Sequence, residues 1–465
     1  MLFTIIKKEI LLNLVSFRFM VSVVLLSVLI VGSMQIMAIN YSRRLEDYSM
    51  GVQMHKNDMA NISTRPEFEA FGVTKDPRPP MLGIFAIGLE KQMSRSFMIP
   101  GYSMTREGEG GRVVYSTSKL IGIMPEGSKY SNPVFTLFMP PDFIYIINIV
   151  LSLLALLFSF DCISGEKEDQ TLKLMLTNSV PRDVILFGKW IGGTISIMLP
   201  FLAAFSLGIL LVVLRKDVSF TGEAPVRIAL ILGASMLYIA VFFLLGLLFS
   251  AFTERSSTSL ILSLFAWVFF VLVIPNISPV IARQIVPLKT PDQIVRESER
   301  IEEDLRHEAM KEQNEEKRKE LWEKMKEDVP KKVRALEERW LNGLQRQTAM
   351  AANISRISPS ANYVYITTSV AGTGLADYIK QKEEIFRYRS DLSSARNKFL
   401  KSDKSKPIPV LYVKIDQDKV PVFQEKGIEW SDSVNNVIWD FVILFAYLAV
   451  FFMVTFIRFL NYDVK

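Results

Sequence analysis

The stretch from Phe143 to Phe160 reads FIYIINIVLSLLALLFSF and carries no charged side chain. An α-helix rises about 1.5 Å per residue, so about 20 apolar residues cross the hydrocarbon core of a bilayer, which is about 30 Å thick. Asp161 ends the run, and Pro140 and Pro141 precede it, as suits the start of a helix. The stretch therefore predicts a helix that spans a membrane.

Similar apolar runs recur along this chain of 465 residues, half of which are hydrophobic. Charged residues fall mostly in the gaps between the runs. The runs predict transmembrane helices at residues 20–39, 143–160, 191–214, 228–252, 260–274 and 437–456. We therefore predict an α-helical membrane protein with about six transmembrane helices. Pro275 is expected to close the fifth helix, because proline lacks the backbone N–H that the helix needs.

The segment before the first span has one apolar and one polar side. Apolar residues recur there at helical spacing, at Phe3, Ile6, Ile10, Leu14 and Phe17. The opposite side is polar and comprises Lys7, Lys8, Glu9 and Asn13. A helix of this kind lies in the membrane interface, and we favour that interpretation over an early start of the first span. No small-residue cleavage site follows the first apolar run, so that run is predicted to remain as an anchor.

Basic residues in short loops set the predicted orientation, because such loops stay in the cytoplasm. They precede the first span or lie between the second and third, at Lys7, Lys8, Arg18, Lys167, Lys173, Arg182 and Lys189. The loop after the third span indicates the opposite orientation, with Arg215, Lys216 and Arg227. Giving the N-terminus most weight, we predict cytoplasmic termini in a plasma membrane, specifically a bacterial inner membrane.

This orientation places two large segments outside the membrane. In the first, residues 112–115 are predicted to form a strand after a glycine-rich turn at residues 108–111. In the second, a charged helix over residues 292–328 is expected to be interrupted at Pro330. The sequence then predicts a helix up to residue 350, another helix over residues 376–400 and a strand over residues 407–413. Because apolar heptad positions stop after Leu305, we predict a solvated helical hairpin rather than a coiled coil.

The predicted outer domain is therefore mixed α+β and mainly helical. The full organisation is an interfacial helix at residues 1–19, transmembrane helix 1 at 20–39, a first extracytoplasmic domain at 40–139, transmembrane helix 2 at 140–162, a cytoplasmic loop at 163–189, transmembrane helices 3–5 at 190–277, a second extracytoplasmic domain at 278–436, transmembrane helix 6 at 437–458 and a cytoplasmic tail at 459–465.

Signatures of catalysis and cofactor binding are missing from the sequence. The two histidines, His55 and His307, are far apart, and Cys162 is the single cysteine, which argues against a transition-metal site and an intrachain disulfide. No Gly-x-x-x-x-Gly-Lys-Ser/Thr loop is present to bind ATP. The net charge of +6 comes from basic residues scattered among acidic ones, which favours contact with anionic lipid over nucleic acid. We expect no catalytic residue, metal or cofactor in this chain.

The loop from Ser164 to Arg182 reads SGEKEDQTLKLMLTNSVPR. Gly165 is expected to end the membrane helix. A charged turn follows, and after it a short helix with a carboxylate-rich start. Its apolar face comprises Leu172, Leu174, Met175 and Leu176. Such a helix is suited to docking in a groove of a soluble partner or to lying on lipid, and the residues alone favour neither.

This loop resembles the one between the second and third spans of type-2 ABC transporter permeases. The family pattern is roughly Gly-Glu-x-Glu-x-Gly-Thr-Leu, followed by an apolar pair, a turn and an arginine. The residues that match it are Gly165, Glu166, Glu168, Thr171, Leu172 and Arg182. Gln170 stands where glycine is usual, and Asn178 and Ser179 replace the common turn of a small residue and proline.

In that family the loop forms a coupling helix that sits in a cleft of a separate ATPase subunit. The resemblance implies an ATPase-coupling role for Glu166, Lys167, Glu168, Thr171, Leu172, Leu174, Met175 and Arg182. In outline the resemblance covers the whole chain, since the interfacial helix, the six spans and the inside termini also fit. Residues 79–89 and 358–360, with the two outer insertions, resemble a subgroup that has large outer domains.

The implied function is that of a permease subunit that couples ATP hydrolysis by the separate ATPase to export of a substrate or to movement of the outer domains. The implied partners are that ATPase, which binds the ATP, a second permease copy in a homodimer or a related permease, membrane lipid and an envelope protein on the outer side. One alternative is a mechanotransmitting subunit that transports nothing. Another is a membrane-anchored scaffold or receptor without an ATPase, although the sequence has no cytoplasmic signalling domain.

Overall fold

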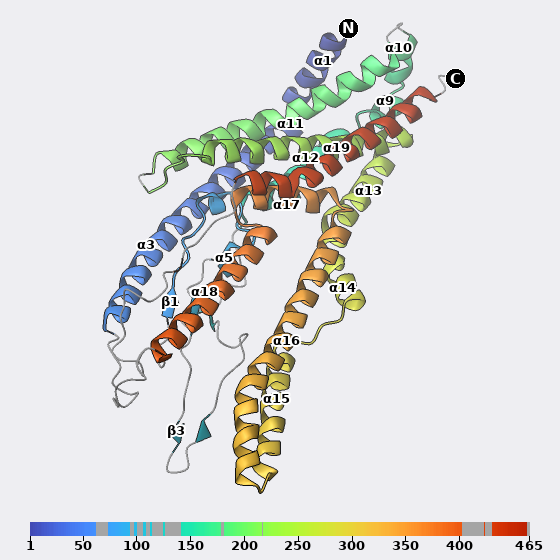
Figure 1. The fold of residues 1–465 in the computed structure, drawn as a ribbon. Coiled ribbons are helices and arrows are strands. Elements are labelled where there is room, and N and C mark those ends of the chain that lie inside the picture. The colour runs from blue at the N-terminus through green and yellow to red at the C-terminus, as the bar shows by residue number, and fades with distance from the viewer. Residues whose placement is uncertain are drawn as a thin grey trace.

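The computed structural model describes residues 1–61, 73–93, 97–99, 106–107, 112–113, 124–125, 141–177, 181–215, 217–401, 423 and 430–462. This part of the chain is mainly helical (Figure 1). Within it, six helical segments are long and apolar enough to cross a membrane: Phe17–Asp58, Phe143–Glu168, Arg182–Val213, Ala224–Phe252, Ser256–Ile285 and Asp432–Leu460. The prediction of about six spans is confirmed in number and in order along the chain.

The first span is preceded by a separate helix, as predicted. Its elements are α1 (Leu2–Val15), α2 (Phe17–Leu26), the π-helical η1 (Ser27–Val31) and α3 (Gly32–Asn61). Ser16 is extended and separates α1 from α2, because its hydroxyl accepts a hydrogen bond from the Phe19 N–H and caps the new helix. The helix of the first span continues to Asn61 rather than ending at residue 39.

Spans two to four are joined by short connections. The second contains α7 (Phe143–Ile146), the π-helical η3 (Ile147–Leu151) and α8 (Ser152–Ser159), and it is followed by α9 (Ser164–Glu168) and α10 (Thr171–Thr177). The third and fourth are α11 (Arg182–Val213) and α12 (Ala224–Phe252). Asp142 caps the second span by accepting hydrogen bonds from the Tyr145 and Ile87 N–H groups, and it thereby holds residues 81–87 against the helix.

The fifth span passes through Pro275, so the prediction that this proline closes the helix was wrong. The span comprises α13 (Ser256–Trp267), the π-helical η4 (Val268–Val273) and α14 (Ile274–Ile285). In a π-helix the carbonyl of Phe270 would accept a hydrogen bond from the backbone N–H of residue 275. Residue 275 is a proline and has no N–H to donate. The Ser358 hydroxyl donates to the Phe270 carbonyl instead, which satisfies the freed backbone group.

The fifth span leads into a helical hairpin of α15 (Pro291–Lys311) and α16 (Glu315–Ser355), which pack against each other. A hairpin was predicted, but its turn lies at residues 312–314 rather than at Pro330. Asn314 starts α16, since its side-chain oxygen accepts hydrogen bonds from the N–H groups of Glu316 and Lys317. The α16 helix continues past position 330 because Val329 and Val333 are buried in the seam of the hairpin.

The chain then returns into the layer of spans. Its last elements are α17 (Pro359–Ala371), α18 (Leu375–Lys401) and α19 (Trp430–Leu460). The α17 helix packs against α12 and α19, and Tyr363 of α17 stacks on Tyr238 of α12 at 4.5 Å between ring centroids. The Asp440 side chain of α19 is 1% exposed and accepts a 2.7 Å hydrogen bond from Arg356 at the end of α16. The ion pair satisfies the buried carboxylate.

Short elements lie between the first and second spans: β1 (Val73–Lys75), the 3-10 helix η2 (Met81–Ile84), α5 (Glu90–Met93), β2 (Phe97–Ile99), β3 (Arg106–Glu107), β4 (Arg112–Val113) and β5 (Met124–Pro125). One antiparallel sheet has the order β1-β2-β5, with Val73 opposite Ile99, and β3 pairs with β4. The β4 strand falls within the predicted strand at residues 112–115. The predicted turn at 108–111 and the strand at 407–413 lie outside the described residues.

Residues 81–87 enter the layer of spans and complete its core. Phe85 is fully buried and lies 5.9 Å from the Phe143 ring and 6.2 Å from the Phe205 ring, between centroids. Gly88 follows with a φ of +45°, and a Cβ there would lie 2.5 Å from the Thr373 carbonyl oxygen. Only glycine fits both the backbone conformation and this close approach, so the turn holds the segment against the end of α17.

Figure 1 shows which elements share an end of the molecule. The N-terminus, the C-terminus, α9 and α10 lie at one end of the span layer. The lower part of α3, the α15–α16 hairpin, α18 and the strands extend from the other. The loop that resembles a coupling helix therefore lies on the face opposite the large insertions.

The Arg356–Asp440 pair gives a stability prediction. Replacing Asp440 by Ala leaves the Arg356 guanidinium without its buried partner and should lower the free energy of unfolding by about 1–3 kcal/mol. Replacing Asp432 by Ala, at an exposed position on the same helix, is the control and should change it by less than about 0.5 kcal/mol. Thermal unfolding in detergent measures both, and equal losses for the two variants would contradict a stabilising role of the pair.

Candidate functional site

The loop after the second span is held by the fourth span. The N–H groups of Ile163 and Ser164 both donate to the Ser250 hydroxyl of α12, each at 2.9 Å. These bonds satisfy the exposed N–H groups at the start of α9, so the chain turns at residues 160–163 and begins a new helix. Gly165 lies inside α9, and the prediction that it ends the membrane helix was wrong.

The loop forms two short helices, α9 and α10, with a turn at Asp169 and Gln170 between them, whereas one short helix after a charged turn was predicted. Gln170 has a φ of +55°, in the left-handed region. Glycine adopts this conformation without steric cost, whereas other L-residues do so at a cost of about 1–2 kcal/mol. The conformation gives a physical reason why the pattern that this loop resembles has glycine here.

A buried lysine fixes α9 to the rest of the protein. The Lys189 side chain is 2% exposed, and its ammonium lies 2.8 Å from Glu166 of α9 and 3.1 Å from Glu9 of α1. Three helices therefore meet in one buried ion cluster, which is costly to break because any removed partner leaves a charge uncompensated. We expected Glu9 and Asn13 on an outward polar face of α1, but Glu9 pairs with Lys189 and Asn13 donates to Ser196 of α11.

Two further cations of the loop bind the ends of spans. The Lys167 ammonium donates to the carbonyls of Ala251 and Thr253, at 2.7 and 2.9 Å, where α12 ends. The Arg182 guanidinium donates to the carbonyls of Phe459, Leu460 and Tyr462, where α19 ends. Each cation satisfies carbonyls that have no partner inside their helix and complements the negative end of the helix dipole.

The eight residues predicted to couple to an ATPase therefore fall into two groups. Glu166, Lys167, Leu172, Met175 and Arg182 are buried or directed into the protein. Glu168, Thr171 and Leu174 are exposed, and Leu174 is 68% exposed although it is apolar. Asp169 and Lys173, which were not among the eight, are exposed beside them. We call Glu168, Asp169, Thr171, Lys173 and Leu174 the loop face. Sequence spacing could not separate the two groups, because the partners of the buried one come from α1, α11, α12 and α19.

Glu168 of the loop face is anchored to the fifth span. Glu168 accepts a 2.7 Å hydrogen bond from the Ser256 hydroxyl, which lies in the first turn of α13. The loop is thus tied by side-chain bonds to α11, α12, α13 and α19, and through Lys189 of α11 to α1. A force applied to the loop face would reach several spans at once.

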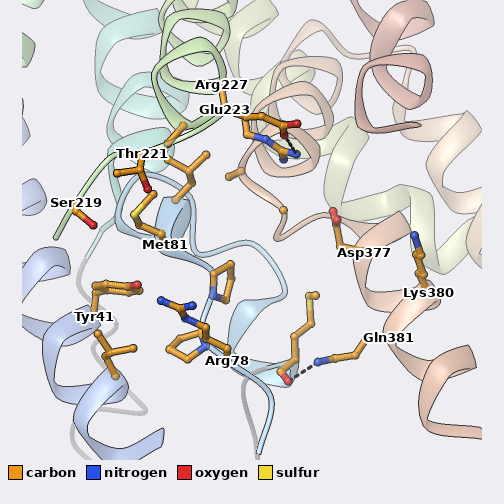
Figure 2. Close-up of a pocket in the computed structure, with 18 of the residues that line it drawn as sticks. Tyr41, Arg78, Met81, Ser219, Thr221, Glu223, Arg227, Asp377, Lys380 and Gln381 are labelled. Atoms are coloured by element: carbon orange, nitrogen blue, oxygen red, sulfur yellow. Dashed lines mark hydrogen bonds and ion pairs between the residues drawn. The ribbon is translucent and has the colours of Figure 1, made fainter. Parts of the chain in front are cut away.

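A cavity of about 690 Å³ lies at the opposite end, between α3, residues 78–82, the loop before α12 and the start of α18 (Figure 2). Its charged lining residues have both signs: Arg78, Arg227, Lys380, Asp217, Glu223, Asp377 and Glu384. Arg227 pairs with Glu223 at 3.1 Å and also donates to the Val370 carbonyl of α17. Asp377 accepts a hydrogen bond from the Gly374 N–H, and burial raises the pKa of its carboxyl to about 6. No sequence pattern indicates this cavity, because its walls come from five separate segments, namely α3, residues 78–82, Met93, residues 217–227 and residues 371–384.

The sequence profile described as "ABC-2 family transporter protein" matches residues 3–464, nearly the whole chain. The chain belongs to this family. A curated relative, described as "Probable ABC transporter permease protein NosY" from Pseudomonas aeruginosa, is 33% identical over 126 residues. That match covers 26% of this chain and 45% of the relative, so the chain spans about half of the relative's length.

Membership of the ABC-2 family confirms the resemblance that the loop suggested. Family membership and the apolar helices of the chain together identify it as a multi-pass membrane permease subunit. The family indicates a non-catalytic membrane subunit and implies an ABC ATPase as a partner in general. The roles of the individual loop residues remain predictions.

Gln170 gives a test of the turn in the loop. Replacing it by Gly should raise the free energy of unfolding by about 0.5–1 kcal/mol, because relief of the left-handed strain exceeds the extra entropy of an unfolded glycine. Replacing the exposed Gln53 inside α3 by Gly is the matched control and should lower it by about 1 kcal/mol. Chemical unfolding in detergent compares the two, and destabilisation by both would rule out the strained turn.

Asp377 gives a pH prediction. Its folded pKa of about 6 lies above the ordinary value of 3.8, so the unfolded chain ionises first as pH rises. Stability should fall by up to about 3 kcal/mol between pH 4 and pH 6 and level off above. The Asp377→Asn variant should lose this part of the pH dependence, while Asp47→Asn, at an exposed position of α3, should keep it. Thermal unfolding from pH 4 to pH 8 measures the difference. If the stability of Asp377→Asn changed with pH in the same way as that of the parent chain, the assignment to Asp377 would be wrong.

Proposed function

We propose that this permease subunit couples ATP hydrolysis in a separate ATPase to movement of its outer segments or to export of a substrate, and that the loop face is where the ATPase binds. The observation that carries the proposal is an exposed leucine among charges on a rigidly held loop. Leu174 projects from a segment whose other side is fixed by the Lys189 ion cluster and the Leu172 core. An apolar anchor surrounded by charged residues is the usual composition of a docking site on a protein partner.

The rest of the proposal follows from this contact. The loop face and both termini are cytoplasmic, in the plasma membrane and specifically the inner membrane of a bacterium. ATP is bound by the ATPase, and this chain binds no cofactor of its own. A second permease copy, identical or related, completes the membrane part, since two ATPases close on each other only if each has a loop face to bind. Membrane lipid surrounds the spans, and an envelope protein is the partner on the outer side.

Movement of the outer segments is better supported than export of a substrate. The α13–η4–α14 span continues into the hairpin, and α14 packs along α16. Trp340 and Gln347 of α16 donate to the carbonyls of Lys289 and Val286, at 2.8 and 2.7 Å, and so fix the connector between α14 and α15. A displaced fifth span would therefore move the hairpin as one unit. Export remains compatible with the same coupling step.

The test is co-purification of the ATPase with the full chain from its native membrane. Replacing Leu174 by Asp together with Asp169 by Lys should lose the ATPase, with at least tenfold less recovered, about 1.4 kcal/mol in binding. The control is Asp217→Lys, a charge reversal at an exposed residue of the opposite end, which should keep the ATPase. Glu166 is unsuitable, because its reversal would place a second cation beside the buried Lys189 and unfold the loop.

Three results would speak against the proposal. Recovery of the chain without any P-loop ATPase would favour a scaffold or receptor. Retention of the ATPase by the Leu174 and Asp169 double variant would place the contact elsewhere. Equal loss in the Asp217 control would indicate a general defect in assembly.

A further inference from the structure

Four helical segments meet at the side chain and carbonyl of Asn148, in the π-helical turn of the second span. Its side-chain oxygen accepts hydrogen bonds from the hydroxyls of Tyr238 in α12 and Ser360 in α17, at 2.8 and 2.7 Å. Its backbone carbonyl accepts from the Ser152 hydroxyl at 2.6 Å. The Ser152 oxygen in turn accepts from the Trp267 indole of α13 at 2.8 Å. Spans two and four and the α17 helix are therefore joined at Asn148, and span five is joined to this centre through Ser152.

The surroundings of Asn148 make these bonds hard to replace. Tyr238, Ser152 and Ser360 are buried, so little water competes for their hydroxyls. A second link lies beside the first, where the Tyr363 hydroxyl of α17 and the Ser235 hydroxyl of α12 are 3.0 Å apart. The π-helical turn itself places Asn148 here, because its extra residue turns one side chain away from the regular helical positions.

The α17 helix connects this centre to the outer segments. The α16 helix enters it and α18 leaves it, and both extend from the same face of the span layer (Figure 1). The entry is fixed by the Arg356–Asp440 pair and by the Ser358 hydroxyl bond to Phe270. With 41 residues, α16 is about 60 Å long, so a rotation of about 5° at its base would move its far end by about 5 Å.

We propose that Asn148 is a positioning residue that transmits displacement of the second span to α17 and thereby to the α15–α16 hairpin. The inference rests on the proposed function, because the second span leads directly into the loop face. A competing route would bypass Asn148 and run through the fifth span into α14, which packs along α16. The two routes differ in whether the Asn148 bonds are needed.

The experiment measures hairpin movement in the full chain purified with its ATPase. Spin labels are placed through Gln313→Cys at the hairpin turn and Val226→Cys at the outer start of α12, both exposed, with Cys162→Ser as background. The label-to-label distance is compared without nucleotide and after trapping with ATP and vanadate. Asn148→Leu removes the side-chain acceptor, and Ser360→Ala and Tyr238→Phe each remove one donor with little risk to folding.

The matched control is Ser159→Ala, which also removes a buried hydroxyl of the second span. That hydroxyl donates only to carbonyls of its own helix, Ala155 and Leu156. We expect a shift of about 5 Å in the parent and in the Ser159→Ala variant. The Asn148→Leu, Ser360→Ala and Tyr238→Phe variants should retain the ATPase and its hydrolysis but lose most of the shift.

A full shift in the Asn148→Leu and Ser360→Ala variants would overturn the inference in favour of the route through the fifth span. A parent complex that hydrolyses ATP without moving the hairpin would overturn it as well and leave the proposed function standing. If no ATPase co-purified with the parent chain, the proposed function would be refuted, and the inference with it.

Discussion

A backbone inside a membrane must have every N–H and carbonyl paired, and at several irregular points of this chain another segment supplies the missing partner. The Ser358 hydroxyl replaces the N–H that Pro275 lacks, and the Ser250 hydroxyl accepts the first N–H groups of α9. Lys167 and Arg182 satisfy the last carbonyls of α12 and α19. Each irregularity is therefore also a contact between elements that are distant in the sequence.

The same constraint places charged residues inside the protein in compensated groups. Lys189 lies between two carboxylates from two other helices, and Asp440 faces Arg356. Such pairs contribute little net stability compared with apolar packing, but removing one member is costly, so they fix which helices must be neighbours. In this permease they fix the loop after the second span to α1 and α11, and the base of the α15–α16 hairpin to α19.

The proposed coupling role depends on rigid connections between the loop face and the α15–α16 hairpin. The loop face is small and exposed, while the segment that carries it is bonded to α11, α12, α13 and α19, and through Lys189 to α1. At the opposite end, a long hairpin and α18 are attached to a helix that lies within the span layer. An arrangement with stiff joints at both ends of the spans suits a subunit that receives a displacement on one face and delivers it on the other, which is the basis of the proposed coupling role.

The sequence by itself determined the membrane class, the number and order of the spans, the separate N-terminal helix and the family. These properties are local, since they depend on uninterrupted apolar runs and on one short motif. Only the tertiary structure decided where helices end and which side chains are exposed. Pro275 and Gly165 were expected to end helices, yet Ser358 and Ser250 from distant segments decided otherwise. Likewise the family resemblance implied an ATPase contact for Glu166, Lys167 and Arg182, whereas Lys189 and the ends of α12 and α19 hold these side chains inside the protein. A hydrogen-bond partner far away in the chain leaves no periodic signal in the sequence, and for that reason these features could be found only once the helices were packed together.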